Sequence, residues 1–166
     1  MNKTMKSLAV AGLLAASAQP VLADDVITVR QMTAELAGDI AREAMLACRE
    51  KGYQASAVVV DRAANTMAVM RDTLAARHTI QIAEEKANAV VMSGVDSGEF
   101  RKNRGDIRME MNHVDGIIML DGGLPIQAAG YMLGAVGVSG APGGDIDAEC
   151  AKAGLDAVAD RLAFIE

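Results

Sequence analysis

This 166-residue chain contains two histidines, and their imidazoles are candidate metal ligands. His78 falls near the start of a predicted helix over residues 76–92, where the positive end of the helix dipole keeps imidazole neutral and able to ligate. It lies about 200° around that helix from Ile80, away from the apolar stripe. Spacing alone favours a solvent-facing or locally hydrogen-bonded histidine, and a metal ligand is the alternative.

The second histidine belongs to the run RMEMNH. If this run is extended, Met109, Met111 and His113 share one face, and two thioethers with an imidazole suit Cu(I). Alternating apolar residues pack in a core or an interface far more often, and methionine fills irregular gaps well, so we favour packing. The sequence contains no Ser/His/Asp set, nucleotide-binding loop or zinc cluster.

A basic run interrupts an otherwise acidic chain. Such a run is usually a solvated loop, which is the interpretation we favour. The alternative is a clamp for propionates or another carboxylate, because arginine binds carboxylates in a bidentate manner. The run comprises Arg101, Lys102, Arg104 and Arg108, and Arg71 or Arg77 would assist the clamp.

Glycine is concentrated between residues 122 and 144, including inside predicted strands. Glycine weakens a strand, but its lack of a Cβ lets another group approach the backbone closely. This density of glycine therefore indicates that a flat ligand or a neighbouring subunit lies against the backbone. The loop over residues 140–144 precedes a helix, and its free N–H groups would attract an anion. Asp145, Asp147 and Glu149 already stand at that helix start, so we favour capping and chain reversal.

Cys48 lies on the apolar side of the first predicted helix, and Cys150 lies beside the stripe of the last. In an oxidising compartment the two could form one disulfide between the terminal helices. Free cysteine is also among the most buried residue types, and we favour two unpaired, buried thiols.

The N-terminus has the three parts of a signal peptide. Lys3 and Lys6 form a basic region, residues 7–18 form an apolar region too short to span a bilayer, and small residues precede Asp24. Cleavage after Ala23 leaves residues 24–166 as a single domain. We expect this domain to be periplasmic or secreted and to have no membrane association.

The mature chain is acidic and poor in aromatic residues. Without the two signal-peptide lysines, fourteen basic side chains face twenty-two acidic ones, so the net charge is −8, and there are two Phe, two Tyr and no Trp. Nucleic acid is excluded as a partner, because its binding needs clustered cations and stacking rings. Small residues leave the outer faces of the helices flat, which suits a homo-oligomer.

The elements that must position these residues follow from the apolar periodicity. A capping box at Thr28 and Gln31 opens the first helix, and the residues between Asp96 and Arg108 are polar and irregular. This order predicts an α+β fold with one antiparallel sheet of about five strands and helices packed on it. The predicted strands are 55–60, 66–70, 116–120, 125–128 and 131–138, and the predicted helices are 28–51, 76–92 and 146–164.

The stretch GGLPIQAAGYMLGAVGVSGAPGGDIDAECAKAGL, residues 122–155, resembles the signature of the GlcG/HbpS-like (DUF336-type) haem-binding family. Upstream, His78-Thr79 and Lys86-Ala87 resemble the HT…KA helix of that family. The resemblance implies a profilin-like fold, haem as the cofactor and His78 as its metal ligand. It also implies cofactor-binding roles for Thr79, Lys86, Gly122, Gly123 and Pro125, with Arg71 beside them.

We therefore expect an exported haem-binding protein that captures, buffers or senses haem. The alternative is a periplasmic accessory protein of an oxidation pathway that binds a small carboxylate or hydroxy acid without haem. A third interpretation, peroxide-dependent haem degradation, is permitted by the resemblance but indicated by no residue, so we assign no catalytic residue. The expected partners are haem, or another small ligand that bears a carboxylate, and further copies of the chain.

Overall fold

The structure is a computed structural model that describes residue 25 and residues 27–163. The predicted signal peptide, residues 1–23, lies outside the described residues. Within the described part, no helix is both long and apolar enough to cross a membrane. The elements are α1 (Ala34–Glu50), β1 (Ser56–Asp61), β2 (Thr66–Arg71), α2 (His78–Ser93), α3 (Ser97–Asn103), η1 (Gly105–Ile107), α4 (Arg108–Met111), β3 (Gly123–Ala128), β4 (Tyr131–Ser139), α5 (Gly144–Asp156) and α6 (Ala159–Ala163).

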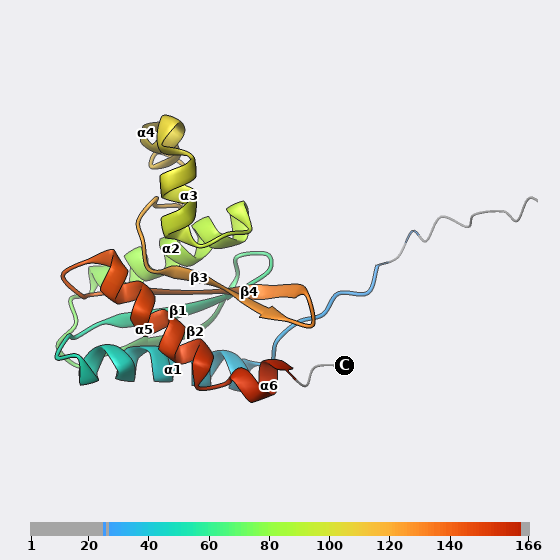
Figure 1. The fold of residues 1–166 in the computed structure, drawn as a ribbon, viewed down its shortest axis with the longest axis horizontal. Coiled ribbons are helices and arrows are strands. Elements are labelled where there is room, and N and C mark those ends of the chain that lie inside the picture. The colour runs from blue at the N-terminus through green and yellow to red at the C-terminus, as the bar shows by residue number, and fades with distance from the viewer. Residues whose placement is uncertain (1–24, 26, 164–166) are drawn as a thin grey trace, which may run out of the picture.

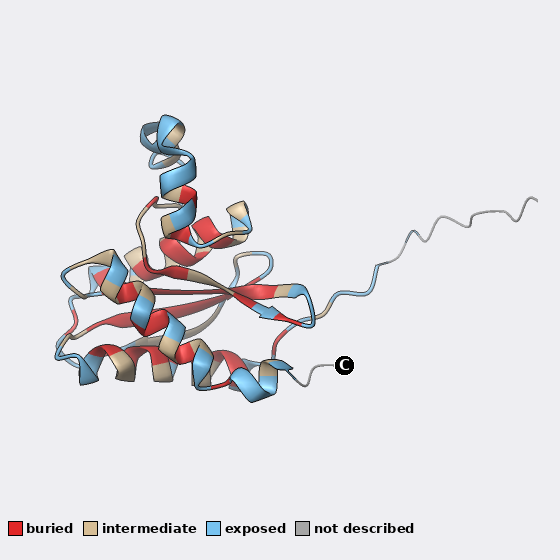
Figure 2. Cartoon of the chain, in the orientation of Figure 1, coloured by how far each residue is buried: buried red, intermediate tan, exposed pale blue. Residues whose placement is uncertain are grey.

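The strands form one antiparallel sheet in the order β2-β1-β4-β3. Helix α2 packs on one face, and α1 together with α5 packs on the other (Figure 1). Every residue of β1 is buried, because this inner strand lies between helices on both faces (Figure 2). The predicted α+β fold, with helices packed on a single antiparallel sheet, is therefore confirmed.

The alternation of side chains along β1 supplies both halves of the core. Ala57 and Val59 belong to the cluster formed with α1 and α5, whereas Val58 and Val60 pack with Ala83 and its neighbours on α2. Burial of one such valine stabilises the fold by about 1.5–3 kcal/mol. This two-sided packing fixes α2, and the residues that it carries, against the sheet.

The predicted fifth strand, residues 116–120, is wrong, and the sheet of the described residues has four strands. This segment pairs with no strand, and its apolar residues serve packing instead. Met119 is fully buried in a small cluster with Ala89 and Phe100. A short apolar run does not by itself distinguish a strand from a buried loop.

Helix boundaries also differ from the prediction. Thr33 caps α1, because its side-chain oxygen accepts the Leu36 N–H at 3.3 Å, so the predicted cap at Thr28 is wrong. The polar segment after Asp96 forms the short helices α3 and α4 rather than an irregular loop, and they project away from the sheet (Figure 1). The last predicted helix is divided after Asp156 into α5 and α6.

A disulfide joins Cys48 of α1 to Cys150 of α5, so the expectation of two unpaired thiols is wrong. The two Cα atoms are 5.3 Å apart, and both residues are fully buried. Gly154 permits this approach of the two helices, because a Cβ at that position would lie 2.7 Å from the carbonyl oxygen of Ile40. The pairing depends on how α5 packs against α1, which the cysteine spacing alone does not reveal.

Candidate functional site

A groove of about 490 Å³ runs beside α2, between this helix and the loop over residues 140–144 that leads into α5. Ile82 and Lys86 line it from α2. Arg101 of α3 and Asp121, which precedes β3, also line it. The groove therefore brings part of the predicted HT…KA helix together with the glycine-rich loop.

A buried ion pair lies at the base of this groove. Lys86 Nζ donates to Asp147 Oδ2 at 2.7 Å and to the carbonyl oxygen of Val138 at 2.9 Å, and the two charged side chains are only 3% and 4% exposed. Asp147 Oδ1 accepts the Ala141 N–H at 3.0 Å. Burial raises the pKa of Asp147, and the positive charge of Lys86 opposes this rise. The pair joins α2, the end of β4, the glycine-rich loop and α5.

This pair changes the expected role of the acidic residues at the start of α5. Asp147 binds Lys86 and the loop instead of capping the helix, and the N-cap residue Gly143 has no side-chain cap. Asp145 remains in the first turn, where its charge offsets the helix dipole. The first turn of α5 therefore borders the groove without a side-chain hydrogen bond at its N-cap, and the carboxylate of Asp145 lies beside it.

The strand glycines contact the protein's own helix. A Cβ at Gly137 would collide with the carbonyl oxygen of Ala83, and one at Gly123 would lie 2.5 Å from the carbonyl oxygen of Lys86. A Cβ at Gly122 would lie 2.8 Å from Lys86 Nζ. The glycine density lets α2 lie directly on β3 and β4, so these glycines give no evidence of a flat ligand or a neighbouring subunit.

His78 is the first residue of α2, and it is exposed. It precedes Ile82 by four residues, about one helical turn, so the two side chains lie on the same edge of the helix. Thr79 is buried instead, where its hydroxyl donates to the carbonyl oxygen of Ala76 and shares a hydrogen bond of 2.7 Å with Ser56 Oγ. His78 is not one of the residues that line the groove; it lies one turn before Ile82, which does line it, and Thr79 fastens the helix to β1.

Arg71 and Pro125 lie apart from the groove. Arg71 ends β2, the edge strand on the far side of β1, and donates to the carbonyl oxygen of Ala75 at 2.5 Å. Pro125 is half-buried in β3, the opposite edge strand. His78 and Lys86 thus lie on one helix, and Arg71 bonds to the connection that leads into this helix, at Ala75, three residues before His78.

The basic run contributes one residue to the groove. Arg101 Nε lies 3.0 Å from Asp121 Oδ1, although the two are not aligned as a hydrogen bond. Arg104 pairs with Asp106 at 3.1 Å within the projecting segment, and both side chains are more than half exposed. The sequence did not predict that Arg101 approaches α2, because this contact depends on the two short helices that it did not predict.

The second histidine does not form the predicted Met–His face. Residues Arg108–Met111 are helical, so Met109 is 73% exposed while Met111 packs inward. His113 lines a separate cleft of about 460 Å³ with Gln81 and Glu85 of α2. Among the described residues, no group of three or more His, Cys, Asp or Glu side chains is arranged to hold a metal ion.

Sequence reasoning missed the partner of Lys86. It assigned Asp147 to helix capping, although the aspartate stands in the same D-x-x-C-A motif that accompanies the HT…KA helix. A buried lysine needs an opposite charge, and this requirement could have indicated an acidic partner for Lys86. The sequence, however, did not show that Lys86 is buried. The motifs that carry the resemblance converge on this ion pair.

These observations define the class of protein: it is an α+β domain in which α2 and its groove lie on one face of a four-stranded antiparallel sheet. The chain belongs to the HbpS-like family, because the family model described as "Haem degrading protein HbpS-like" matches residues 32–156. The matched region contains the groove, His78 and both disulfide cysteines. The resemblance inferred from the two motifs is therefore confirmed.

Solved structures share this fold. The structure of HbpS has a TM-score of 0.76 and 31% identity, and the match covers 81% of this chain and 94% of that chain. A double mutant of Streptomyces reticuli HbpS has the same TM-score and 28% identity, with 94% and 99% covered. A PduOC–heme complex, at 16% identity, a TM-score of 0.67 and coverage of 77% and 95%, shows the fold alone. A search of the curated proteins found no match.

Proposed function

We propose that this chain binds haem beside α2, with His78 as an iron ligand. The observation that supports the proposal is that His78 is an exposed imidazole at the start of α2, one turn before Ile82, which lines the groove. Family membership supports haem as the ligand, since the family description names a haem-degrading protein. The PduOC–heme complex shows that a protein with the same fold has been solved with haem.

The residues beside the groove fit a haem that stays partly exposed. Ile82, Leu120 and Pro142 offer apolar surface, and Arg101, which is 40% exposed, offers a guanidinium to a propionate. The groove is open and has no aromatic wall. Bound haem would supply a redox-active iron centre, while His78 would hold the iron and Arg101 would bind a propionate.

The biological setting is part of the same proposal. The tripartite N-terminus supports export, with a mature protein that begins at Asp24 in the periplasm or outside the cell. Haem capture, buffering or sensing suits such a location, and the small-residue faces support self-association. Intact mass of the exported protein and light scattering at micromolar concentration test these two statements.

A second candidate is a small carboxylate or hydroxy acid. The uncapped first turn of α5 and the guanidinium of Arg101 both border the groove, and both groups favour an anion. Asp121 and Asp145 stand in the same lining and oppose it. Because these carboxylates oppose a small anion, and because the family description names haem, haem is the candidate that we favour.

Absorbance of the mature protein during a haemin titration tests the proposal. A saturable Soret band is expected, with a stoichiometry of one haemin per chain. Bleaching of that band by peroxide would add haem degradation to the function. Absence of a saturable band, together with binding of a small carboxylate detected by calorimetry, would replace the proposal by the second candidate.

A further inference from the structure

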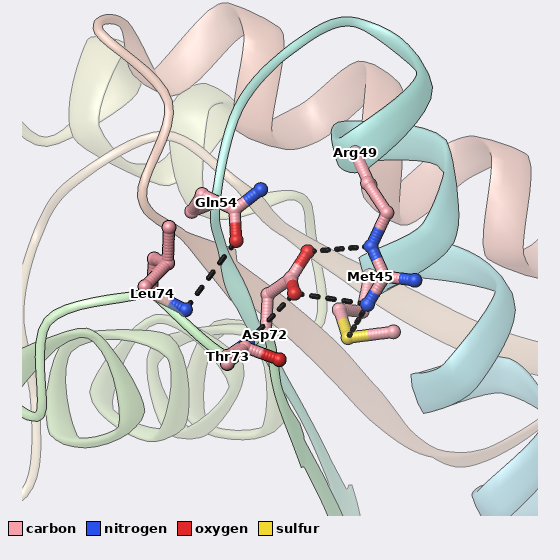
Figure 3. A network of polar contacts seen from close by, with 6 residues as sticks. All are labelled: Met45, Arg49, Gln54, Asp72, Thr73 and Leu74. Atoms are coloured by element: carbon pink, nitrogen blue, oxygen red, sulfur yellow. Dashed lines mark hydrogen bonds and ion pairs between the residues drawn. The ribbon is translucent and has the colours of Figure 1, made fainter.

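A buried carboxylate outside the groove fixes the segment that leads into His78. Asp72 follows β2, and its side chain is only 3% exposed. Arg49, in the last turn of α1, donates from Nε to Asp72 Oδ2 at 2.8 Å and from Nη2 to Oδ1 at 2.9 Å (Figure 3). Oδ1 also accepts the N–H of Thr73 at 2.7 Å. Both carboxylate oxygens are therefore engaged.

The backbone between Asp72 and α2 is held at both ends. The Asp72 N–H donates to the carbonyl oxygen of Ala55 at 3.0 Å, and the Asp72 carbonyl oxygen accepts the Ala75 N–H at 3.0 Å. At the other end, the N–H and the hydroxyl of Thr79 both donate to the carbonyl oxygen of Ala76. A short connection with these bonds transmits the position of Asp72 to the first turn of α2.

Arginine is the residue type that this contact requires. Its planar guanidinium binds both oxygens of one carboxylate in a fixed orientation, whereas a lysine ammonium makes one adjustable contact. Arg49 also comes from α1, which covers the face of the sheet opposite α2. The Arg49–Asp72 pair therefore ties the connection before α2 to the helical layer on the other side of the sheet.

We infer that Arg49 is a positioning residue for ligand binding at His78: through Asp72 it fixes the connection that sets the position of the imidazole at the start of α2. The inference rests on the proposed function, because it assigns Arg49 a role only if His78 binds the iron. Arg49 itself is separated from His78 by Asp72 and the connection, so it touches neither the ligand nor the imidazole. Its effect must therefore depend on His78.

The test compares haemin titrations of wild type, Arg49→Met, Arg49→Lys and His78→Ala in one buffer. Arg49→Met should weaken haemin binding by at most about tenfold, the lower end of the effect of a direct partner of a ligating histidine, because Arg49 acts one step further away; it should also shift the Soret maximum toward that of His78→Ala. Arg49→Lys keeps the charge and should give an intermediate loss. Lys51→Met is the matched control, because Lys51 ends the same helix and forms an exposed ion pair with Glu149.

Combining Arg49→Met with His78→Ala distinguishes an effect that acts through His78 from a general loss of structure. If Arg49 acts through the imidazole, Arg49→Met should cause no further loss of affinity once His78 is removed. An equal loss in both backgrounds, or an unchanged titration of a folded Arg49→Met or Arg49→Lys protein, would overturn the inference alone. A wild-type protein whose Soret band does not depend on His78 would refute the proposed function and the inference together.

Discussion

Replacement of Lys86 by methionine should be among the most destabilising single changes in this chain. The substitution removes the ammonium group and keeps an unbranched side chain that is one atom shorter, but it leaves the carboxylate of Asp147 buried, with the Ala141 N–H as its remaining partner. Breaking a buried pair in this way costs about 3–5 kcal/mol, because the uncompensated charge has lost its hydration. For a domain of this size we expect a fall of about 10–20 °C in the midpoint of thermal unfolding.

Urea unfolding of the wild type and three variants measures this cost and assigns its cause. Lys86→Met with Asp147→Asn removes both charges and keeps an acceptor for Ala141, so it should recover about 2 kcal/mol relative to Lys86→Met alone. Lys152→Met breaks an exposed pair with Asp156 and should change stability by less than about 0.5 kcal/mol. A loss below about 1 kcal/mol for Lys86→Met, or a double variant no more stable than that single variant, would refute the reasoning.

Three further predictions concern the scaffold. Gly137→Ala should lower the free energy of unfolding in urea by about 3 kcal/mol, because the new Cβ collides with the backbone of α2. Gly38→Ala, which has open space around it in α1, should raise that free energy by about 0.5–1 kcal/mol, and similar values for the two variants would contradict the packing. Replacing both disulfide cysteines by alanine should lower the free energy of unfolding by about 4–5 kcal/mol, as expected for a cross-link between residues 102 apart, and an unchanged value would show that the bond does not form. The hydrogen bond from Arg49 holds the pKa of Asp72 below its ordinary value of 3.8. This carboxylate therefore stabilises the fold above that pH, and its contribution is lost as pH falls through the lowered pKa. Between pH 6 and pH 2 the free energy of unfolding should fall less steeply in Asp72→Asn than in wild type, and parallel curves would argue against the pair.

The periodicity of apolar residues was sufficient to predict two strands of the sheet and the helix that packs on it. The strands at residues 55–60 and 66–70 and the helix over 76–92 were predicted within a few residues of their observed bounds, because their apolar residues recur with the period of the element. Residues 116–120 have the same apolar character without a partner strand. Which strands pair depends on tertiary contacts, so the count of five exceeded the four that form.

The site was predictable in its residue types and not in its pairings. His78 was expected to point away from the apolar stripe, and it is exposed. Lys86 was expected to meet a ligand or a subunit, yet its amine bonds to Asp147, 61 residues further along the chain. The approach of Arg101 and the disulfide are likewise long-range contacts. Each follows from how closely glycine lets the helices pack, a distance that local sequence patterns do not encode.

The central claim is that haem iron is bound by His78. The most direct measurement is the Soret maximum and affinity of the haemin complexes of wild type, His78→Ala and His113→Ala in one buffer. His113 is the matched control, because it is the other imidazole and lines a separate cleft. We predict that His78→Ala shifts the maximum and weakens binding while His113→Ala changes neither. An unchanged spectrum and affinity in His78→Ala would contradict the claim.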